Sequence, residues 1–205
     1  MVVTLFRHGM RVDNKRQAFL GWNDSPLLEE SVEMLSRYDF DMDAYDLFLM
    51  SDIQRCVRTM EILFPKAKAI AMPELREMNL GTLEGKVHNE LKHDKEYMEW
   101  LKAPFEKTPP HGGESFDEFA ERVALGWKKI VDLILDKDAN TPFIVTHGGV
   151  IRYYLTRFVS EKKGFWEWSI PHGTGYEFTF TRSGLRRGEK CISLREVHLT
   201  EREDG

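Results

Sequence analysis

The segment VVTLFRHGMRVDN, residues 2–14, decides the fold class of this chain. It begins with five mostly apolar residues, 2–6, and runs directly into Arg7, His8 and Gly9. A short apolar run bounded in this way is typical of a buried β-strand. In open α/β sheets, ligands bind outside the carboxyl ends of the strands. A cation and an imidazole at that end therefore predict a ligand site where the first strand stops.

A second stretch, PFIVTHGG at residues 142–149, repeats this pattern. It is again a β-rich run that ends in His-Gly, here His147 and Gly148. Two parallel strands that each deliver a histidine at the carboxyl end would bring the imidazoles of His8 and His147 together. A glycine after each histidine lets a ligand approach the backbone closely. Each histidine taken alone has an alternative, which is a core or capping residue satisfied by the backbone.

Short apolar runs alternate along the chain with helical periodicity, and this predicts an α/β fold. The expected strands are residues 2–6, 47–50, 67–72, 143–146 and 176–181, with a less regular one at 191–199.

Four helices are predicted, the first two from capping signals. Ser25-Pro26 resembles an N-cap followed by proline in the first turn, and Ser51 with Gln54 forms a capping-box pattern. A third helix is expected at 115–135, where aromatic and aliphatic residues recur every three or four positions. A fourth is expected after Gly149.

The character of the sequence changes between residues 86 and 113. This stretch is charged, carries aromatic residues and ends in a Pro-Pro and Gly-Gly loop. We interpret it as a short cap-like excursion over the sheet edge, within a single domain that spans residues 1–205.

Arg55 and Glu77 are the remaining candidates for chemistry. Arg55 falls in the first turn of the predicted second helix, where free N–H groups and the helix dipole already favour an anion. Together with Arg7 it can bind a phosphate, because a planar guanidinium can donate two parallel hydrogen bonds to phosphate oxygens. Glu77 lies in a partly apolar loop, where a carboxyl can act as a general acid. The alternatives are surface ion pairs, of Arg55 with Asp52 or Glu61 and of Glu77 with Arg76 or a lysine.

Composition narrows the class of partner. The chain has 205 residues, 41% of them hydrophobic and 31% charged, with a formal net charge of -5. This balance argues against nucleic acid or an anionic membrane as the main partner.

The two cysteines, Cys56 and Cys191, make no disulfide framework or metal cluster. Neither a secretory signal nor a membrane-length apolar segment is visible, so we expect a cytoplasmic protein.

Six motifs in order resemble the histidine phosphatase superfamily, also called the phosphoglycerate mutase-like family. The matching segments are LFRHG with Asn14, GWNDSPL, SDIQRCVRT, LREMNLGTLEG, PPHGGES followed by ERV, and IVTHGGVIR. This resemblance covers most of the first 155 residues. It implies a three-layer fold with a central, mostly parallel sheet flanked by helices.

The resemblance also implies a role for each matching residue. His8 would be the nucleophile that forms a phosphohistidine, and Arg7, Arg55 and His147 would clamp the phosphoryl oxygens. Asn14 and Gly148 would line the substrate site, and Glu77 would protonate the leaving alkoxide. This scheme implies no metal and no cofactor. His88 and His93 are unsupported by a ligand cluster, so no metal site is expected there.

The chain also departs from the family pattern. Where members commonly have Arg-His-Gly followed by Glu-Thr or Gln-Thr, this chain has Met10 and Arg11. We hypothesise that Arg11 points outward and reads a second acidic group on the substrate, with a surface arginine as the alternative. His172, in the loop IPHGTGY, can reach the pocket but is interpreted as structural.

Three functions remain open. The favoured one is a phosphatase for small phosphomonoesters, because residues 86–113 contain no arginine to hold a second acidic group. The alternatives are a cofactor-dependent phosphoglycerate mutase and a non-catalytic phosphate-ligand binder. Sugar phosphates, α-ribazole 5′-phosphate and broad-specificity hydrolysis all fit the motifs.

Four aromatic residues can form an apolar wall for the leaving group or simply the core of the cap: Trp22, Tyr97, Trp100 and Phe105. No single exposed apolar stripe predicts an oligomeric state.

Overall fold

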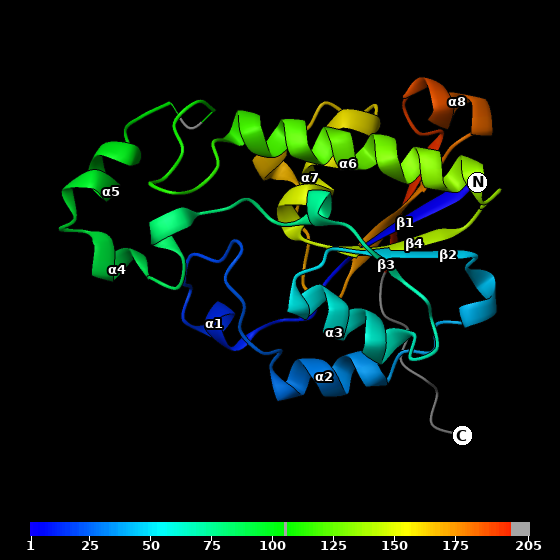
Figure 1. Cartoon of the computed structure of the whole chain (residues 1–205), viewed down its shortest axis with the longest axis horizontal. Helices are drawn as coiled ribbons and strands as arrows, with labels where there is room; N and C mark the ends of the chain where they lie inside the picture. The colour runs from blue at the N-terminus through cyan, green and yellow to red at the C-terminus, as the bar shows by residue number, and fades with distance from the viewer. Residues whose placement is uncertain (105, 198–205) are drawn as a thin grey trace.

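A six-stranded mixed sheet forms the centre of the molecule (Figure 1). The computed structural model describes residues 1–104 and 106–197. Its strands are β1 (Val2–Arg7), β2 (Leu47–Met50), β3 (Ile70–Ala71), β4 (Pro142–Thr146), β5 (Gly175–Thr179) and β6 (Ser193–Val197). They lie in the order β3-β2-β4-β1-β5-β6. The first four in that order are parallel to one another, and β5 runs antiparallel to both β1 and β6.

Helices cover both faces of this sheet. The α-helices are α1 (Val12–Lys15), α2 (Glu29–Ser36), α3 (Gln54–Leu63), α4 (His88–Leu91), α5 (Lys95–Trp100), α6 (Phe116–Asp136), α7 (Gly148–Phe158) and α8 (Arg182–Arg187). Four short 3₁₀ helices join them: η1 (Met42–Ala44), η2 (Pro73–Leu75), η3 (Gly81–Leu83) and η4 (Phe165–Glu167). In Figure 1, α2 and α3 lie on one side of the sheet, and α6, α7 and α8 lie on the other.

Successive side chains of a strand point to opposite faces of the sheet, so the hydrophobic core is divided into one part on each face. Val3 and Leu5 of β1 point to the α6–α7 side, where they join the buried faces of those helices. Phe6 points to the opposite side and packs with α2 and α3. The structure thus confirms the predicted α/β fold with three layers and a mostly parallel sheet.

Two predicted helix starts are wrong, and both errors have a local cause. The helix expected at Ser25-Pro26 begins only at Glu29, because this stretch is extended and Leu27 forms a β-bridge with Arg11. The helix expected at Ser51 begins at Gln54, with Ile53 as its N-cap. The other two predictions fit the structure closely: Ser115 caps α6 with a capping box, and α7 begins at Gly148.

Strand limits also differ at the sheet edges. The strand expected at 67–72 is reduced to the two residues of β3. The strand expected at 191–199 is β6, Ser193–Val197, and residues 198 and 199 lie outside those described.

The cap-like segment carries α4 and α5, which lie beyond the end of the sheet toward which β1 runs (Figure 1). Leu91 and Tyr97 of this segment form a small buried cluster with Leu83. Phe19 and Leu80 pack against that cluster from the body of the molecule. Tyr97 therefore belongs to the core of the cap, which was one of the two interpretations for the aromatic residues there.

Within residues 1–104 and 106–197, no helix has the length and apolar character that crossing a membrane requires.

Candidate active site

The site forms where three neighbouring parallel strands end. His8 follows β1, His147 follows β4 and Ser51 follows β2. The register of the sheet aligns these ends, since the N–H of His8 donates to the carbonyl of Thr146 at 3.1 Å and the N–H of Ser51 to that of Val145 at 2.9 Å. The imidazoles of His8 and His147 consequently meet, with their ring centroids 5.1 Å apart.

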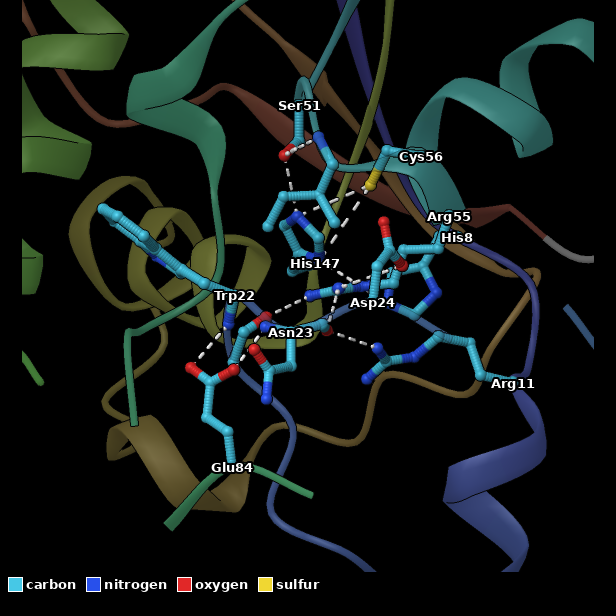
Figure 2. Close-up of polar contacts among 12 residues, drawn as sticks. His8, Arg11, Trp22, Asn23, Asp24, Ser51, Arg55, Cys56, Glu84 and His147 are labelled. Carbon is cyan, nitrogen blue, oxygen red and sulfur yellow. Dashed lines mark hydrogen bonds and ion pairs between the residues drawn. The ribbon is translucent and has the colours of Figure 1, made fainter. Parts of the chain in front are cut away.

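The His8 ring is held in one tautomer by its own backbone. Nδ1 lies 2.7 Å from the carbonyl oxygen of Gly9, which can only accept, so Nδ1 carries the proton. Nε2 is therefore the nitrogen with the lone pair, and it faces Arg55 (Figure 2). Burial, followed by the positive charge of Arg55, holds the pKa of His8 well below its usual value. The ring is thus neutral and has its nucleophilic nitrogen turned toward a cation.

His147 is completely buried on the other side of Arg55. Its Nδ1 accepts a hydrogen bond from Arg55 Nε at 3.2 Å, and its Nε2 lies 2.9 Å from the hydroxyl of Ser51. The thiol of Cys56 lies 3.5 Å from the same Nε2 (Figure 2). Burial and the charge of Arg55 lower the pKa of His147 well below its usual value as well.

Arg55 connects the two histidines, and its side chain is almost fully buried. Its Nε lies 3.3 Å from His8 Nε2, so this donor is shared between the two imidazoles. The terminal nitrogens donate to the carbonyls of Gly21 at 2.6 Å and Asn23 at 3.3 Å. Asp24 forms an ion pair with the guanidinium at 3.7 Å.

The sequence left open that Arg55 is a solvated arginine paired with Asp52 or Glu61. This alternative is wrong, since Arg76 pairs with Asp52 and Arg58 pairs with Glu61.

The loop 21–24 that receives Arg55 is held by a single carboxylate. Glu84 accepts from the backbone N–H groups of Trp22, at 2.7 Å, and of Asn23 (Figure 2). A Cβ on Gly21 would overlap the carbonyl of Met78, so only glycine fits at this position. These partners of Arg55 were not identified from the sequence, although Gly21 is the one local signal.

Arg7 brings a second guanidinium to the same strand end. Its Nη1 donates to the carbonyl of Ile170 at 2.5 Å, and its Nε is buried without a partner among the described residues. Burial lowers the pKa of Arg7 to about 10. A Cβ on Gly148 would lie only 3.2 Å from Arg7 Cζ, so glycine lets the guanidinium pass close to the start of α7.

Glu77 is fixed against the N-terminus of α7. Its Oε2 accepts from the N–H of Gly149 at 3.0 Å, and its Oε1 accepts from the N–H of Met78, also at 3.0 Å. A Cβ on Gly149 would overlap Oε1. The carboxylate thus uses the free donors and positive potential of a helix N-terminus. The alternative of an ion pair with Arg76 is wrong, because Arg76 bonds Asp52 through two nitrogens.

The structure corrects the hypothesis for Arg11. Its side chain does not point outward but is buried, and its Nη1 donates to the carbonyl of Asn23 at 3.0 Å (Figure 2). Both the outward-facing reader and the surface arginine are wrong, because this loop carbonyl draws the guanidinium inward beside Arg55. The side chain of Asn14, in the single turn of α1, accepts from the N–H of Arg11 at 2.9 Å.

His172 lies at the site although the sequence indicated a structural role. Its ring centroid is 5.4 Å from that of His8, and its Nε2 is buried without a partner among the described residues. Its loop is anchored to β1, since the N–H of Gly173 donates to the carbonyl of Arg7 at 3.1 Å. Burial, followed by the charge of Arg7, lowers the pKa of His172 to about 3.

The buried neutral histidines predict that the protein loses stability in mild acid. The unfolded chain binds protons on His8, His147 and His172 below a pKa of about 6.5, whereas the folded chain does not, so the free energy of unfolding rises with pH. Between pH 7.5 and 5.5 each of the three rings contributes about 1.4 kcal/mol, so we expect a loss of about 4 kcal/mol on acidification.

Urea unfolding at the two pH values measures this loss. His147→Asn is expected to reduce the difference by about a third, while His93→Ala, at an exposed position on the cap, leaves it unchanged. Equal free energies of unfolding at pH 7.5 and 5.5 would contradict the neutral state of these rings.

The chain belongs to branch 1 of the histidine phosphatase superfamily, whose family model matches residues 3–188. An adenosylcobalamin/alpha-ribazole phosphatase from Salmonella typhimurium is 25% identical over 180 residues, which cover 84% of this chain and 87% of that protein. A probable phosphoglycerate mutase from Erwinia tasmaniensis is 32% identical over 157 residues, covering 71% of this chain and 69% of that protein. Both kinds of relative are named for small phosphorylated molecules.

Solved structures share the fold of this chain. The alpha-ribazole phosphatase from Shigella flexneri superposes with a TM-score of 0.79 at 22% identity, covering 98% of this chain and 96% of that one. This likeness shows the fold alone. A phosphoglycerate mutase from Thermus thermophilus superposes with a TM-score of 0.66 at 28% identity, covering 98% of this chain and 100% of that one.

Proposed function

We propose that the protein is a phosphatase that hydrolyses small phosphomonoesters through a phosphohistidine on His8. The observation that carries this proposal is the state of the His8 ring. It is neutral, its Nδ1 proton is bound to Gly9, and its Nε2 faces the guanidinium of Arg55 at 3.3 Å. A nucleophile with a free lone pair beside a fixed cation suits attack on an anionic phosphoryl group. We also propose that the chain forms one histidine phosphatase domain, with residues 86–113 as its short cap.

In the first step, the lone pair of His8 Nε2 attacks phosphorus and the bond from phosphorus to the ester oxygen breaks. Arg55 Nε, which lies between the two imidazoles, then donates to a phosphoryl oxygen in place of the histidine nitrogens. Arg7 supplies a second guanidinium through its unpartnered Nε. These cations stabilise the charge that accumulates on the equatorial oxygens in the transition state.

His147 can join the clamp through a change of tautomer. Arg55 donates to the Nδ1 of His147, so Nε2 carries the proton and donates to Ser51. A hydroxyl can also donate, so a turn of the Ser51 hydroxyl lets Nε2 accept and frees Nδ1 to carry the proton. The Nδ1–H then donates to a phosphoryl oxygen. Gly148 and the amide of Asn14 are proposed to complete the substrate site.

Glu77 is proposed to move the protons. Its protonated carboxyl donates to the leaving oxygen, which departs as the alcohol. The resulting carboxylate takes a proton from water, whose oxygen attacks phosphorus while the bond to His8 Nε2 breaks. Inorganic phosphate leaves, and the ring regains its lone pair. The N–H groups of Gly149 and Met78 hold the carboxylate in place through both steps.

Glu77→Gln is expected to lower kcat for alkyl phosphates about 100-fold, because these leaving groups need the proton. Formation of p-nitrophenolate needs none, so p-nitrophenyl phosphate should still give a rapid burst of one equivalent before slow hydrolysis of the phosphoenzyme. Glu74→Gln is the matched control, since Glu74 instead pairs with Lys129. Equal losses in the burst and in alkyl phosphate turnover would contradict the general-acid role.

Hydrolysis is favoured over phosphoryl return because the short cap at residues 86–113 carries no arginine for a second acidic group. A phosphoglycerate mutase is the second candidate, favoured by the relatives of that name. The test measures release of inorganic phosphate from p-nitrophenyl phosphate in excess EDTA, beside isomerisation of 3-phosphoglycerate with 2,3-bisphosphoglycerate. Metal-independent phosphate release that exceeds isomerisation supports the phosphatase, and faster isomerisation would overturn it.

A further inference from the structure

An apolar cavity of about 220 Å³ lies directly beside Glu77. Half of the described residues that line it are aromatic, and Glu77 and Arg152 are the only charged ones among them. The cavity extends from Gly149 at the start of α7 to Trp100 at the end of the cap helix α5. Separate parts of the chain therefore supply its walls: the cap, the loop after α1, the segment 77–80, the helices α6 and α7, and η4.

The proposed chemistry decides what must enter this cavity. The proton on Glu77 goes to the leaving oxygen, so the leaving group has to lie against that carboxyl. A second cavity of about 440 Å³ borders Arg55 and has Asp24 and Arg58 in its lining. Glu77 does not line this second cavity. The leaving group is therefore directed into the apolar cavity beside Glu77 and not into the second one.

The aromatic walls are fixed by contacts of their own. Trp100 stacks with Tyr97 at 6.2 Å and donates from Nε1 to the carbonyl of Thr108 at 3.1 Å. Phe165 meets Phe116 edge to face at 5.0 Å. Such rings form a preorganised apolar surface, which lowers the cost of ordering the site when a ligand binds.

Arg152 places the one cationic group in the described wall of this cavity. Its Nε donates to the carbonyl of Trp168 at 3.0 Å, and its guanidinium lies 5.9 Å from the ring centroid of Trp166. A planar guanidinium near an aromatic ring leaves its flat face and the aromatic ring as contact surface. A strongly polar leaving group would exchange its hydration for a mostly apolar surface with few matching hydrogen bonds, which is unfavourable.

We propose that this cavity binds the leaving group and makes the protein select phosphomonoesters of alcohols that carry a bulky apolar or aromatic group. The inference rests on the proposed phosphatase function for its catalytic consequence. It also has a consequence for binding alone, because a phosphonate that cannot be hydrolysed still places its organic group in the cavity.

The catalytic test compares n-alkyl phosphates of increasing length, together with benzyl phosphate and glycerol 1-phosphate. We expect kcat/KM to rise about fourfold for each added methylene, the factor that corresponds to burial of one such group, until the cavity is full. Benzyl phosphate should be hydrolysed more efficiently than glycerol 1-phosphate. Hydrolysis that does not depend on chain length, and is as fast for glycerol 1-phosphate, would overturn the inference.

The binding test uses calorimetry with benzylphosphonate and methylphosphonate. We expect benzylphosphonate to bind at least tenfold more tightly, and Trp166→Ala to reduce this ratio. Ile192→Ala is the matched control, because Ile192 and Trp166 are both 67% exposed and Ile192 lies outside the cavity. Equal affinity for the two phosphonates overturns the cavity proposal, whereas tight binding without hydrolysis of any ester overturns the phosphatase function alone.

Discussion

Replacement of His8 by alanine is expected to abolish turnover of phosphomonoesters, with kcat reduced by about 10⁵-fold or more. Loss of a covalent nucleophile removes the whole two-step route, and effects of this size are typical of such positions. The arginines that are proposed to bind the phosphoryl group remain in this variant. Substrate should therefore still bind, and the loss should fall on kcat with little change in the Kd for inorganic phosphate.

Steady-state hydrolysis of p-nitrophenyl phosphate and calorimetric titration with phosphate measure these two effects. His93→Ala serves as the control, since it removes an imidazole from an exposed position on the cap. The buried ring of His8 also contributes to packing, so the free energy of unfolding of each variant is measured beside its activity. A folded His8→Ala protein that keeps more than a few per cent of wild-type kcat would show that His8 is not the nucleophile.

Replacement of Arg55 by alanine is expected to lower kcat/KM by about 10⁴-fold, because an arginine that stabilises transferring phosphoryl oxygens contributes effects of this order. Arg55 Nε touches both imidazoles, at 3.3 Å and 3.2 Å, and no other side chain joins the two rings in the described part of the chain. Arg55→Lys keeps the charge but not the planar fork, so we expect an intermediate loss.

Arg58→Ala is the matched control for this prediction. Arg58 lies one turn further along α3 and pairs with Glu61 at the surface, where both side chains are more than half exposed. A surface pair of this kind contributes little. Arg55→Ala also leaves the carbonyl of Gly21 without its donor and removes one of the two donors to the carbonyl of Asn23, so a loss of stability accompanies the loss of activity. Equal kcat/KM in the Arg55→Ala and Arg58→Ala proteins would contradict the proposed clamp.

The fold was predictable because its signals are local. Apolar runs identified β1, β2 and β4, and apolar residues spaced three or four apart identified α6, which the structure begins at Phe116. Ser51 misled for a reason that only the three-dimensional structure supplies. A serine followed three residues later by glutamine is a capping pattern, but the hydroxyl of Ser51 is bound to His147, which is distant in sequence.

The placement of His8 and His147 was also predictable, since it follows from two parallel strands with the same ending. The partners of the arginines were not. Arg55 and Arg11 donate to the carbonyls of a loop whose position depends on Glu84. Every residue has a backbone carbonyl, so the sequence does not show which carbonyls accept these hydrogen bonds. The nearness of His172 to His8 likewise depends on a loop that is anchored to β1 by backbone hydrogen bonds.

The most direct test of the account is to trap the covalent intermediate. Enzyme mixed with a ³²P-labelled phosphomonoester is quenched in alkali within milliseconds, digested, and searched for the modified peptide by mass spectrometry. The account predicts an alkali-stable, acid-labile phosphoryl group on His8, formed as fast as the alcohol is released and absent in His8→Ala. Turnover without any phosphoenzyme, or a label on a residue other than His8, would contradict it.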